Sequence, residues 1–405
     1  MLATMGSVVF IYNTMAAEDS AGFFLALATT QLIAVIARFG QEQINTREFL
    51  LDKEQAGIRY VVSLISGLFF SLTCVVVVYF VFSVEWLNIA SSIDPKQAAA
   101  LYWFWVLGSV VPQITGAVFR GMRRIGMSEF LSTGSIPGMN LMLLIFFRPE
   151  DFASLLSCYA LGGLAGSLIS LFLAVRNHLF YAASRLARGF DIGGHFAEGA
   201  RIVIVSLMTT LVTQMPIFLA SYLGTDKELS DFGLVYRFTP FLALPLSIAA
   251  IVVSGRAPVV ISGGPEILRS FNHDISKIIR VACVAYSLSI ATACRFSPVS
   301  LIQPVIPEFS ESMLESVLLM AGASLIAFTF GPASQLLVSV RETTLVLWAN
   351  FACAAFCFIL YSLSAFFIRA TDVAYVWSFV TIFQAAIWYS LLVRRTPLRA
   401  SVFKS

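Results

Sequence analysis

Two arginines lie inside stretches of the sequence that are otherwise mostly apolar. Arg237 lies near the start of a run over 231–254, and Arg38 lies toward the end of a run over 21–44. Placing an arginine at the centre of a bilayer costs roughly 2.5–3.5 kcal/mol on insertion scales, so an embedded arginine usually faces a polar interior and marks a pathway. Arg237 is also only about two helical turns inside its run, where a long side chain can snorkel back to the interface. The sequence allows both arrangements.

Carboxylates are missing from the middle of every apolar run, and Glu42 lies near the end of its run. A proton- or sodium-coupled exporter of cationic drugs normally needs a buried carboxylate as its coupling group. Embedded arginines instead suit an anionic substrate, because a guanidinium stays charged and binds phosphate oxygens bidentately. The neutral polar side chains of the runs are amides, most of which are expected to bond between helices while a few line a cavity. These amides are Asn13, Gln31, Gln113, Asn140, Gln214, Gln335, Asn350 and Gln384.

The histidines and cysteines carry no enzymatic signature. His178, His195 and His273 lie in polar loops, without an HExxH motif, a nucleophile elbow or a phosphate-binding glycine loop. We expect each histidine to be a surface residue. All six cysteines fall inside apolar runs and form no CxxC pair, which is typical of small buried hydrophobic residues. We therefore expect no enzymatic activity, no metal and no cofactor.

The composition indicates which elements position these residues. The chain has 405 residues, of which 58% are hydrophobic and only 12% are charged, unlike a soluble domain. It indicates an all-α polytopic membrane protein, because a helix satisfies its own backbone inside lipid. A net charge of +3 is too small to suggest nucleic-acid binding. Twelve hydrophobic runs predict spans over 1–16, 21–44, 59–83, 97–118, 129–147, 152–175, 200–223, 231–254, 280–295, 314–339, 343–368 and 371–393.

The distribution of basic residues predicts the orientation of these spans. If the N-terminus lies in the cytoplasm, 19 lysines and arginines fall in cytoplasmic segments and 5 fall in outer loops. This alternation agrees with the positive-inside rule and places the C-terminus in the cytoplasm as well. The chain opens on an apolar run without a basic n-region or a small-residue cleavage site, so we expect no removable signal peptide.

The longest inner loop divides the predicted spans into six and six. We expect an N-terminal six-helix lobe over 1–175, a cytoplasmic inter-lobe loop over 176–199, a C-terminal six-helix lobe over 200–394 and a cytoplasmic tail over 395–405. An even number of spans in each lobe predicts parallel repeats, which are related by an axis along the membrane normal.

Two further features concern single spans. Prolines at 112, 137, 216, 240, 245 and 332 interrupt several of them, as in transporters whose helices bend around a cavity. Residues 263–279 have the pattern of an interfacial amphipathic helix, but an extension of the span over 280–295 is the favoured interpretation.

Five segments of the chain resemble the polysaccharide-biosynthesis flippases of the multidrug/oligosaccharidyl-lipid/polysaccharide exporter superfamily. They are EDSAGFF after the first span, RFGQEQINTREF at the end of the second, FRGMRRIG after the fourth, DFGLVYRF with LPLSIAAIVVSGRAPVVIS in the eighth, and FGPASQLLVSV in the tenth. The resemblance covers nearly the whole chain, and the eighth span is its most specific part. It implies two six-helix lobes around a central cavity that opens alternately inward and outward.

The resemblance also implies a substrate and a location. The expected substrate is an undecaprenyl-diphosphate-linked oligosaccharide repeat unit, carried from the cytoplasmic to the periplasmic leaflet of the bacterial inner membrane, with a glycan polymerase and glycosyltransferases as possible partners. We expect Arg38 and Arg237 to hold the diphosphate, with help from Arg47 and Arg120. The full set expected around the substrate cavity is Arg38, Arg47, Arg120, Arg237, Gln31, Gln113 and Gln214.

Two alternatives of different kinds compete with the flippase. A cation-coupled exporter of drugs or metabolites has the same fold, but the missing buried carboxylates count against it. A membrane scaffold of a glycan-assembly complex would leave the embedded arginines and the proline-broken spans without a purpose. The flippase is therefore the favoured interpretation of the sequence.

Overall fold

A computed structural model of the chain describes residues 2–51, 56–83, 95–177, 179, 191–242, 265–295, 299, 302–331, 333, 336–337, 343–364 and 372–396. Within these ranges the regular structure is helical and includes no strand. The all-α class predicted from composition is thus confirmed.

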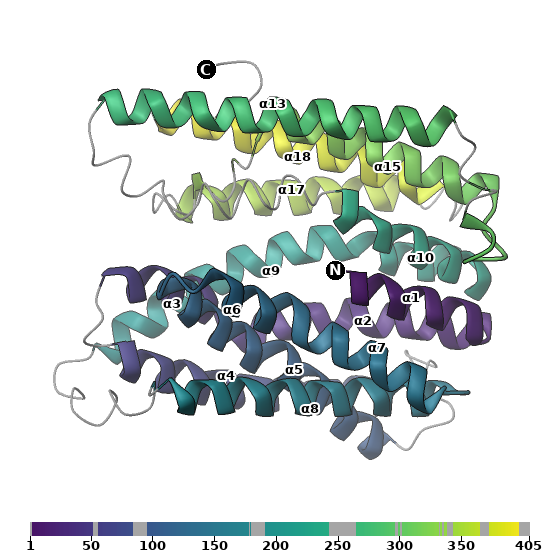
Figure 1. Ribbon diagram of the computed structural model, residues 1–405, viewed down its shortest axis with the longest axis horizontal. Coiled ribbons are helices and arrows are strands. Elements are labelled where there is room, and N and C mark those ends of the chain that lie inside the picture. The colour runs from purple at the N-terminus through teal and green to yellow at the C-terminus, as the bar shows by residue number, and fades with distance from the viewer. Residues whose placement is uncertain are drawn as a thin grey trace. The chain divides into compact units, whose positions relative to one another are not determined.

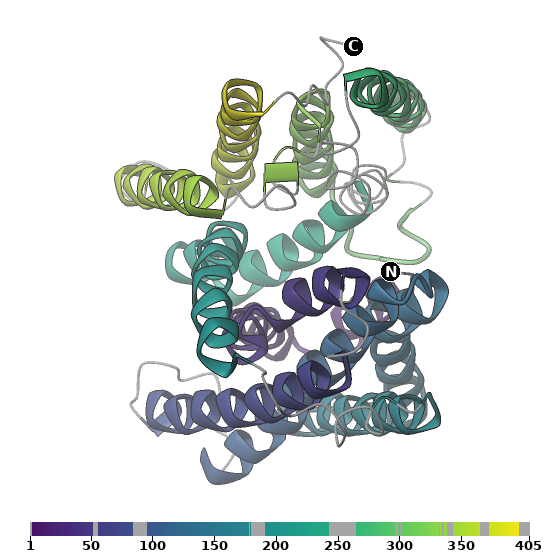
Figure 2. The same ribbon diagram turned by 90° about the vertical axis from the view of Figure 1, so that its left-hand side faces the viewer.

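The chain forms two compact units, Met1–Gln214 and Met215–Ser405. Unit 1 contains α1 (Leu2–Thr14), α2 (Ala17–Arg38), α3 (Gln41–Leu51), α4 (Ala56–Ser83), α5 (Pro95–Gly121), α6 (Ile125–Glu129), the π-helix η2 (Phe130–Gly134), α7 (Ser135–Phe147), α8 (Phe152–Arg176) and most of α9 (Ile192–Leu223) (Figure 1). Unit 2 contains the end of α9 and α10 (Asp226–Leu242), α13 (Pro265–Arg295), α15 (Glu311–Thr329), α17 (Thr343–Ser364) and α18 (Val373–Arg395). Figure 2 looks nearly along the axes of α13, α17 and α18, which run roughly parallel to one another. The lobe boundaries expected from the sequence stay a prediction.

Most of these helices match a predicted membrane span. Among the described residues, nine helices are long and apolar enough to cross a bilayer, and two shorter apolar helices lie at Leu2–Thr14 and Thr344–Leu360. The chain is therefore a multi-pass membrane protein. Large apolar side chains that are exposed on α4, α7 and α8, such as Phe69, Phe146 and Phe172, are suited to contact with lipid tails rather than water.

The second helix ends earlier than the predicted span over 21–44. α2 stops at Arg38 because Phe39 and Gly40 both adopt left-handed backbone, with φ of 47° and 70°, before α3 begins at Gln41. Left-handed backbone costs a residue with a side chain roughly 1–2 kcal/mol, whereas glycine adopts it freely. The Phe39 ring offsets this cost by stacking on Phe70, with centroids 4.3 Å apart and planes 11° apart. We call the turn at Phe39 and Gly40 the elbow.

Other predicted spans also begin or end elsewhere. The span over 200–223 belongs to the longer helix α9, and the span over 280–295 continues back to Pro265 as the single helix α13. The extension of that span is therefore confirmed. The span over 231–254 is described only as far as Leu242, so its second half and residues 243–264 lie outside the described residues.

Helices α5 and α8 cross with their backbones in contact. A Cβ atom added to Gly108 would lie 2.3 Å from the Cα of Gly163, and one added to Gly163 would lie 2.4 Å from the carbonyl oxygen of Phe104. Close approach of this kind supplies the dispersion energy that holds helices together in lipid, where the hydrophobic effect between helices is absent. The two glycines thus allow the close crossing of α5 and α8 in unit 1.

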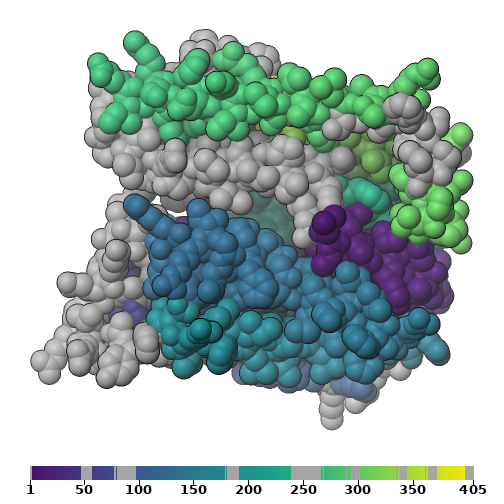
Figure 3. Space-filling view, viewed as in Figure 1, coloured from purple at the N-terminus to yellow at the C-terminus, as the bar shows by residue number. Residues whose placement is uncertain are grey.

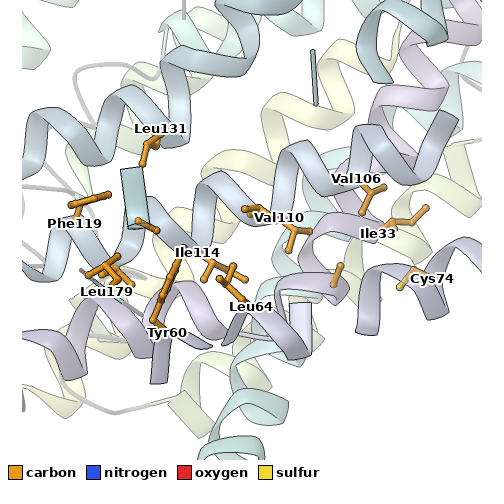
Figure 4. Packing of buried hydrophobic residues seen from close by; sticks show 14 residues of the cluster. Ile33, Tyr60, Leu64, Cys74, Val106, Val110, Ile114, Phe119, Leu131 and Leu179 are labelled. Atoms are coloured by element: carbon orange, nitrogen blue, oxygen red, sulfur yellow. The ribbon is translucent and has the colours of Figure 1, made fainter. Parts of the chain in front are cut away.

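A hydrophobic cluster fills the space between α2, α4 and α5. Figure 4 shows the Tyr60 ring beside Ile114 and Leu64. The buried Tyr60 hydroxyl is 3.0 Å from the Thr115 hydroxyl, which satisfies both polar groups. The other buried members are Ile33, Ala37, Cys74, Val106, Val110, Val111, Val118, Phe119, Leu131, Ala174 and Leu179. This cluster packs α2, α4 and α5 against one another.

Candidate functional site

Arg38 lies beside the elbow and pairs with a carboxylate across it. Its Nε donates to the carbonyl oxygen of Ala34 at 3.1 Å, and its Nη1 donates to Oε2 of Glu42 at 2.8 Å. The two side chains of the ion pair are 21% and 30% exposed. An anionic ligand could reach this guanidinium only by sharing it with Glu42 or by displacing Glu42.

Arg120 is placed in a similar way at the end of α5. Its Nη2 donates to Oε1 of Glu129 at 2.9 Å, and the two side chains are 27% and 33% exposed. Glu129 closes α6, so the ion pair ties the two helices together. The positive charges of Arg38 and Arg120 are therefore both matched locally by carboxylates.

The remaining predicted residues of unit 1 have varied surroundings. Gln113 donates its Nε2 hydrogen to the carbonyl oxygen of Ser132 at 2.7 Å, inside the π-helix, where widened turns often leave a carbonyl that needs a partner. Gln31 is half-buried on α2. Arg47 belongs to α3, but its side chain lies outside the described part of the structure. Among the described side chains of unit 1, no hydrogen bond joins two of the predicted site residues.

Gln214 is the last residue of unit 1 and lies within α9. It is only 5% exposed, and its Oε1 accepts no hydrogen bond from the described residues. A buried amide oxygen without a donor costs about 1–3 kcal/mol. This acceptor is therefore suited to a hydroxyl or an amide of a ligand.

Arg237 belongs to unit 2 and is little exposed. It lies in α10 and is 7% exposed, with its guanidinium carbon 5.8 Å from the centre of the Tyr236 ring. Tyr236 in turn meets the edge of Trp377 of α18, with centroids 6.3 Å apart and planes at 88°. The Arg237 guanidinium thus lies close to the Tyr236 ring, which itself packs on Trp377 of α18. A guanidinium so little exposed would bind an anion more strongly than one in water, since the local dielectric is lower.

A buried polar cluster behind the elbow was not predicted from the sequence. It consists of Gln41, Asn45, Ser63 and His195, of which the first three are fully buried and His195 is 8% exposed. Oε1 of Gln41 is 2.7 Å from Nε2 of His195 and accepts from the Ser63 hydroxyl at 2.7 Å. Nδ2 of Asn45 donates to the Ser63 hydroxyl at 3.1 Å. The expectation that His195 is a surface residue is wrong, because its ring is buried and bonded to Gln41 at the start of α3.

The elbow and α9 also interlock through two glycines. A Cβ atom on Gly40 would lie 2.8 Å from Cβ of Ile202, and one on Gly199 would lie 2.8 Å from the carbonyl oxygen of Phe39. Phe196 extends the contact, since its ring lies 5.8 Å from that of Phe39. The first turns of α9 are therefore held on the elbow by close backbone approach, by aromatic contact and by the buried polar cluster.

A capping box stabilises the start of α8. The side chain of Asp151 accepts a hydrogen bond from the backbone N–H of Ser154 at 2.8 Å and another from its hydroxyl. These hydrogen bonds hold the pKa of Asp151 below its usual value of 3.8, because they favour the charged carboxylate.

The fold is that of a known class of membrane transporters. A transporter of the MOP superfamily from Pyrococcus furiosus, described as having a binding pocket of reverse polarity, superposes with a TM-score of 0.70 at 14% identity, over 97% of this chain and 91% of the other. A multidrug resistance MATE family transporter in its inward-facing conformation superposes with a TM-score of 0.67 at 15% identity, over 97% of this chain and 95% of the other. The outward-facing conformation of a multidrug resistance MATE family transporter superposes with a TM-score of 0.67 at 16% identity, over 97% of this chain and 93% of the other. No protein-family model and no curated protein matches the sequence.

Proposed function

We propose that the chain is a membrane transporter that works by alternating access. The support is its fold, which covers nearly the whole length of transporters known in both an inward-facing and an outward-facing conformation. We further propose that it resides in a bacterial inner membrane with both termini in the cytoplasm, as the distribution of its basic residues predicts.

The proposed cargo is an amphiphile with an anionic headgroup, of the polyprenyl-diphosphate-linked oligosaccharide class. The observation that carries this proposal is the burial of Arg237 in α10. A buried guanidinium retains its charge and can bind a diphosphate through two parallel hydrogen bonds. Outward movement of the negative charge would be favoured by about 2.3 kcal/mol per charge for each 100 mV of membrane potential. Arg38 and Arg120 would contribute only after exchanging their glutamate partners for the headgroup.

The P. furiosus transporter supports this choice of cargo. It is described as having a binding pocket of reverse polarity that suggests a different function. Members of this fold therefore need not all bind the same class of substrate. A cationic side chain inside a span of this chain is consistent with a cargo opposite in charge to the usual cationic drugs.

A multidrug exporter is the second candidate, and two observations favour it. The other structures of the same fold described above are multidrug resistance transporters. In addition, Glu42 and Glu129 already neutralise the two described arginine side chains of the predicted site in unit 1. In this case Glu42 or Glu129 would offer the carboxylate that a cationic substrate or a coupling proton needs.

Depletion of the protein in its own host separates these functions. The anionic-cargo proposal predicts that polyprenyl-diphosphate-linked saccharide accumulates on the cytoplasmic face of the membrane, measured by leaflet-selective labelling. An unchanged lipid pool together with weaker efflux of a cationic dye would support the multidrug exporter. If neither the lipid pool nor dye efflux changed, the proposal of a transporter for either cargo would be contradicted.

A further inference from the structure

Helix α13 presents one face to its own unit and leaves the other face exposed. The buried face carries Ile275, Ile279 and Tyr286, which are spaced four and seven residues apart and are 3%, 2% and 8% exposed. Tyr286 packs edge to face against Phe328 of α15, with ring centroids 5.6 Å apart. This contact fixes the rotation of α13 about its axis. Figure 3 shows α13 as an exposed green ridge along the edge of unit 2.

The exposed face changes from basic to apolar along the helix. Residues spaced three or four apart share one face of a helix. Arg269, His273, Lys277 and Arg280 follow this spacing and are all exposed. We call these four residues the cationic stripe, after the charges of Arg269, Lys277 and Arg280. The same spacing continues the stripe into apolar positions, of which Val284 and Leu288 are 60% and 64% exposed.

The apolar half of this face is expected to lie in the hydrocarbon of the bilayer, because its exposed side chains are aliphatic. Val281 is also exposed, at 63%, and large aliphatic side chains exposed on a membrane span face lipid tails. The helix has 31 residues, so it is about 46 Å long against a hydrocarbon thickness of about 30 Å. Several turns of α13 therefore extend beyond the hydrocarbon. Because Arg295 ends the helix at the apolar side, those turns are at the Pro265 end, where the cationic stripe lies.

The cationic stripe carries a net positive charge at the depth of the lipid headgroups. Lys277 lies about 4–5 Å along the axis from Arg280, and His273 about 6 Å further, at 1.5 Å per residue. Among the described residues, neither Lys277 nor Arg280 forms an ion pair. Glu266 and Asp274 are also exposed on α13 and reduce the net charge of its first turns. Asp274 lies three residues before Lys277 and offsets part of its charge. Arg280 lies six residues beyond Asp274 and next to the apolar positions, so the charge at the boundary is positive.

We propose that the cationic stripe, with Lys277 and Arg280 at its centre, binds the headgroup of an anionic phospholipid. The guanidinium of Arg280 can bind two oxygens of a phosphodiester, and the Lys277 ammonium adds a point charge beside it. The acyl chains of the same lipid then lie along Val281, Val284 and Leu288. This surface belongs to the outside of unit 2, so the inference does not depend on the cargo proposed above.

The test uses the full-length protein in nanodiscs of equal parts phosphatidylglycerol and phosphatidylcholine with matched acyl chains. A benzophenone amino acid at Val284 reports which lipid lies beside the stripe, through mass spectrometry of the photo-crosslinked adducts. The same probe at Phe379 of α18, which is 55% exposed, reports the bulk lipid composition. We expect phosphatidylglycerol to be enriched at Val284 relative to Phe379, and the enrichment to fall as NaCl is raised.

Charge variants complete the test. Each basic residue near an anionic surface contributes a factor of roughly five in lipid partitioning, so K277Q/R280Q should abolish the enrichment at Val284. The matched control R295Q removes an exposed charge from the other end of α13 and should leave the enrichment unchanged. The charge-retaining variant R280K should lower the enrichment only in part, because lysine keeps the charge but loses the bidentate fork. Equal crosslinking of both lipids in the wild-type protein, or undiminished enrichment in K277Q/R280Q, would overturn the proposal. A protein–protein adduct at Val284 in place of lipid adducts would also overturn it, and would indicate that a second chain covers this face.

Discussion

Nε2 of His195 lies 2.7 Å from Oε1 of Gln41, although the two residues are 154 positions apart in the sequence. An amide oxygen only accepts hydrogen bonds, so the imidazole donates from Nε2. The contact joins the first turns of α9 to the start of α3, directly behind the elbow. It shows that the described end of the predicted inter-lobe loop, from residue 192 onward, belongs to α9 and packs on unit 1.

Replacing His195 should therefore destabilise unit 1. H195A removes the donor and leaves a cavity beside Oε1 of Gln41, at an expected cost of about 1–3 kcal/mol. H195Q retains an amide donor and should cost less. The thermal midpoint of the purified protein in detergent is the measurement, compared with that of H273A as a control, because His273 is exposed. An unchanged midpoint in H195A would contradict the importance of the contact.

The glycines of the α5–α8 crossing give a second stability prediction. G108A places a methyl group 2.3 Å from the Gly163 backbone, so the helices must separate, at an expected cost of 3 kcal/mol or more, above the ~1–3 kcal/mol of ordinary overpacking. G138A and G322A are matched controls, because a Cβ atom at either position meets nothing within 4 Å. These controls should be neutral or slightly stabilising, since alanine is the better helix former. A folded G108A protein with wild-type stability would contradict close backbone contact between α5 and α8 at this crossing.

The capping box of α8 predicts a pH dependence. The pKa of Asp151 is lowered in the folded protein, so the hydrogen bonds contribute stability at pH values above about 4 and lose it as the pH falls through the folded-state value. D151A should lower the free energy of unfolding by about 1 kcal/mol at pH 7. The difference between D151A and the wild type should shrink in acid, as measured by thermal unfolding at several pH values. A difference that is independent of pH would show that the carboxylate charge does not matter.

The ion pairs at Arg38 and Arg120 can be opened one at a time. If the cargo is anionic, E42Q and E129Q should each strengthen binding of a short polyprenyl diphosphate by roughly 5- to 10-fold, because each frees a guanidinium for a charge-assisted hydrogen bond. Intrinsic fluorescence titration of the purified protein measures this. E150Q is the control, since Glu150 is exposed and lies in a loop. Weaker diphosphate binding, together with loss of cationic dye efflux, would instead identify Glu42 or Glu129 as part of a multidrug site.

Hydropathy was sufficient to predict most of the membrane-length helices among the described residues. Twenty apolar residues in lipid have few alternatives to a helix, and the runs over 59–83, 97–118 and 152–175 correspond closely to α4, α5 and α8. The break at the elbow was missed because Phe39 carries no turn signal and a single glycine such as Gly40 is also tolerated inside a helix. The left-handed backbone of Phe39 is stabilised by Phe70, which is a tertiary contact that sequence periodicity cannot show.

The candidate site was predicted less well, for the same kind of reason. Glu42 lies four residues after Arg38, so that pair follows from helical spacing. The partner of Arg120 lies across a turn, and His195 lies in the polar stretch FDIGGHFAEGAR, where only the fold reveals its burial. It stays a prediction that one substrate is surrounded by the full set of site residues. These are Arg38, Arg47, Arg120, Arg237, Gln31, Gln113 and Gln214.

The central claim is that Arg237 recognises an anionic headgroup during transport. The most direct test is the rate at which the reconstituted protein moves a fluorescent polyprenyl-diphosphate saccharide across proteoliposome membranes, comparing the wild type with R237K and with R148K as the exposed control. Lysine keeps the charge but loses the bidentate fork, so R237K should slow translocation by about ten-fold or more, for a loss of ~1.4 kcal/mol or more, while R148K should match the wild type. Full translocation by R237K, or none by the wild-type protein, would contradict the account.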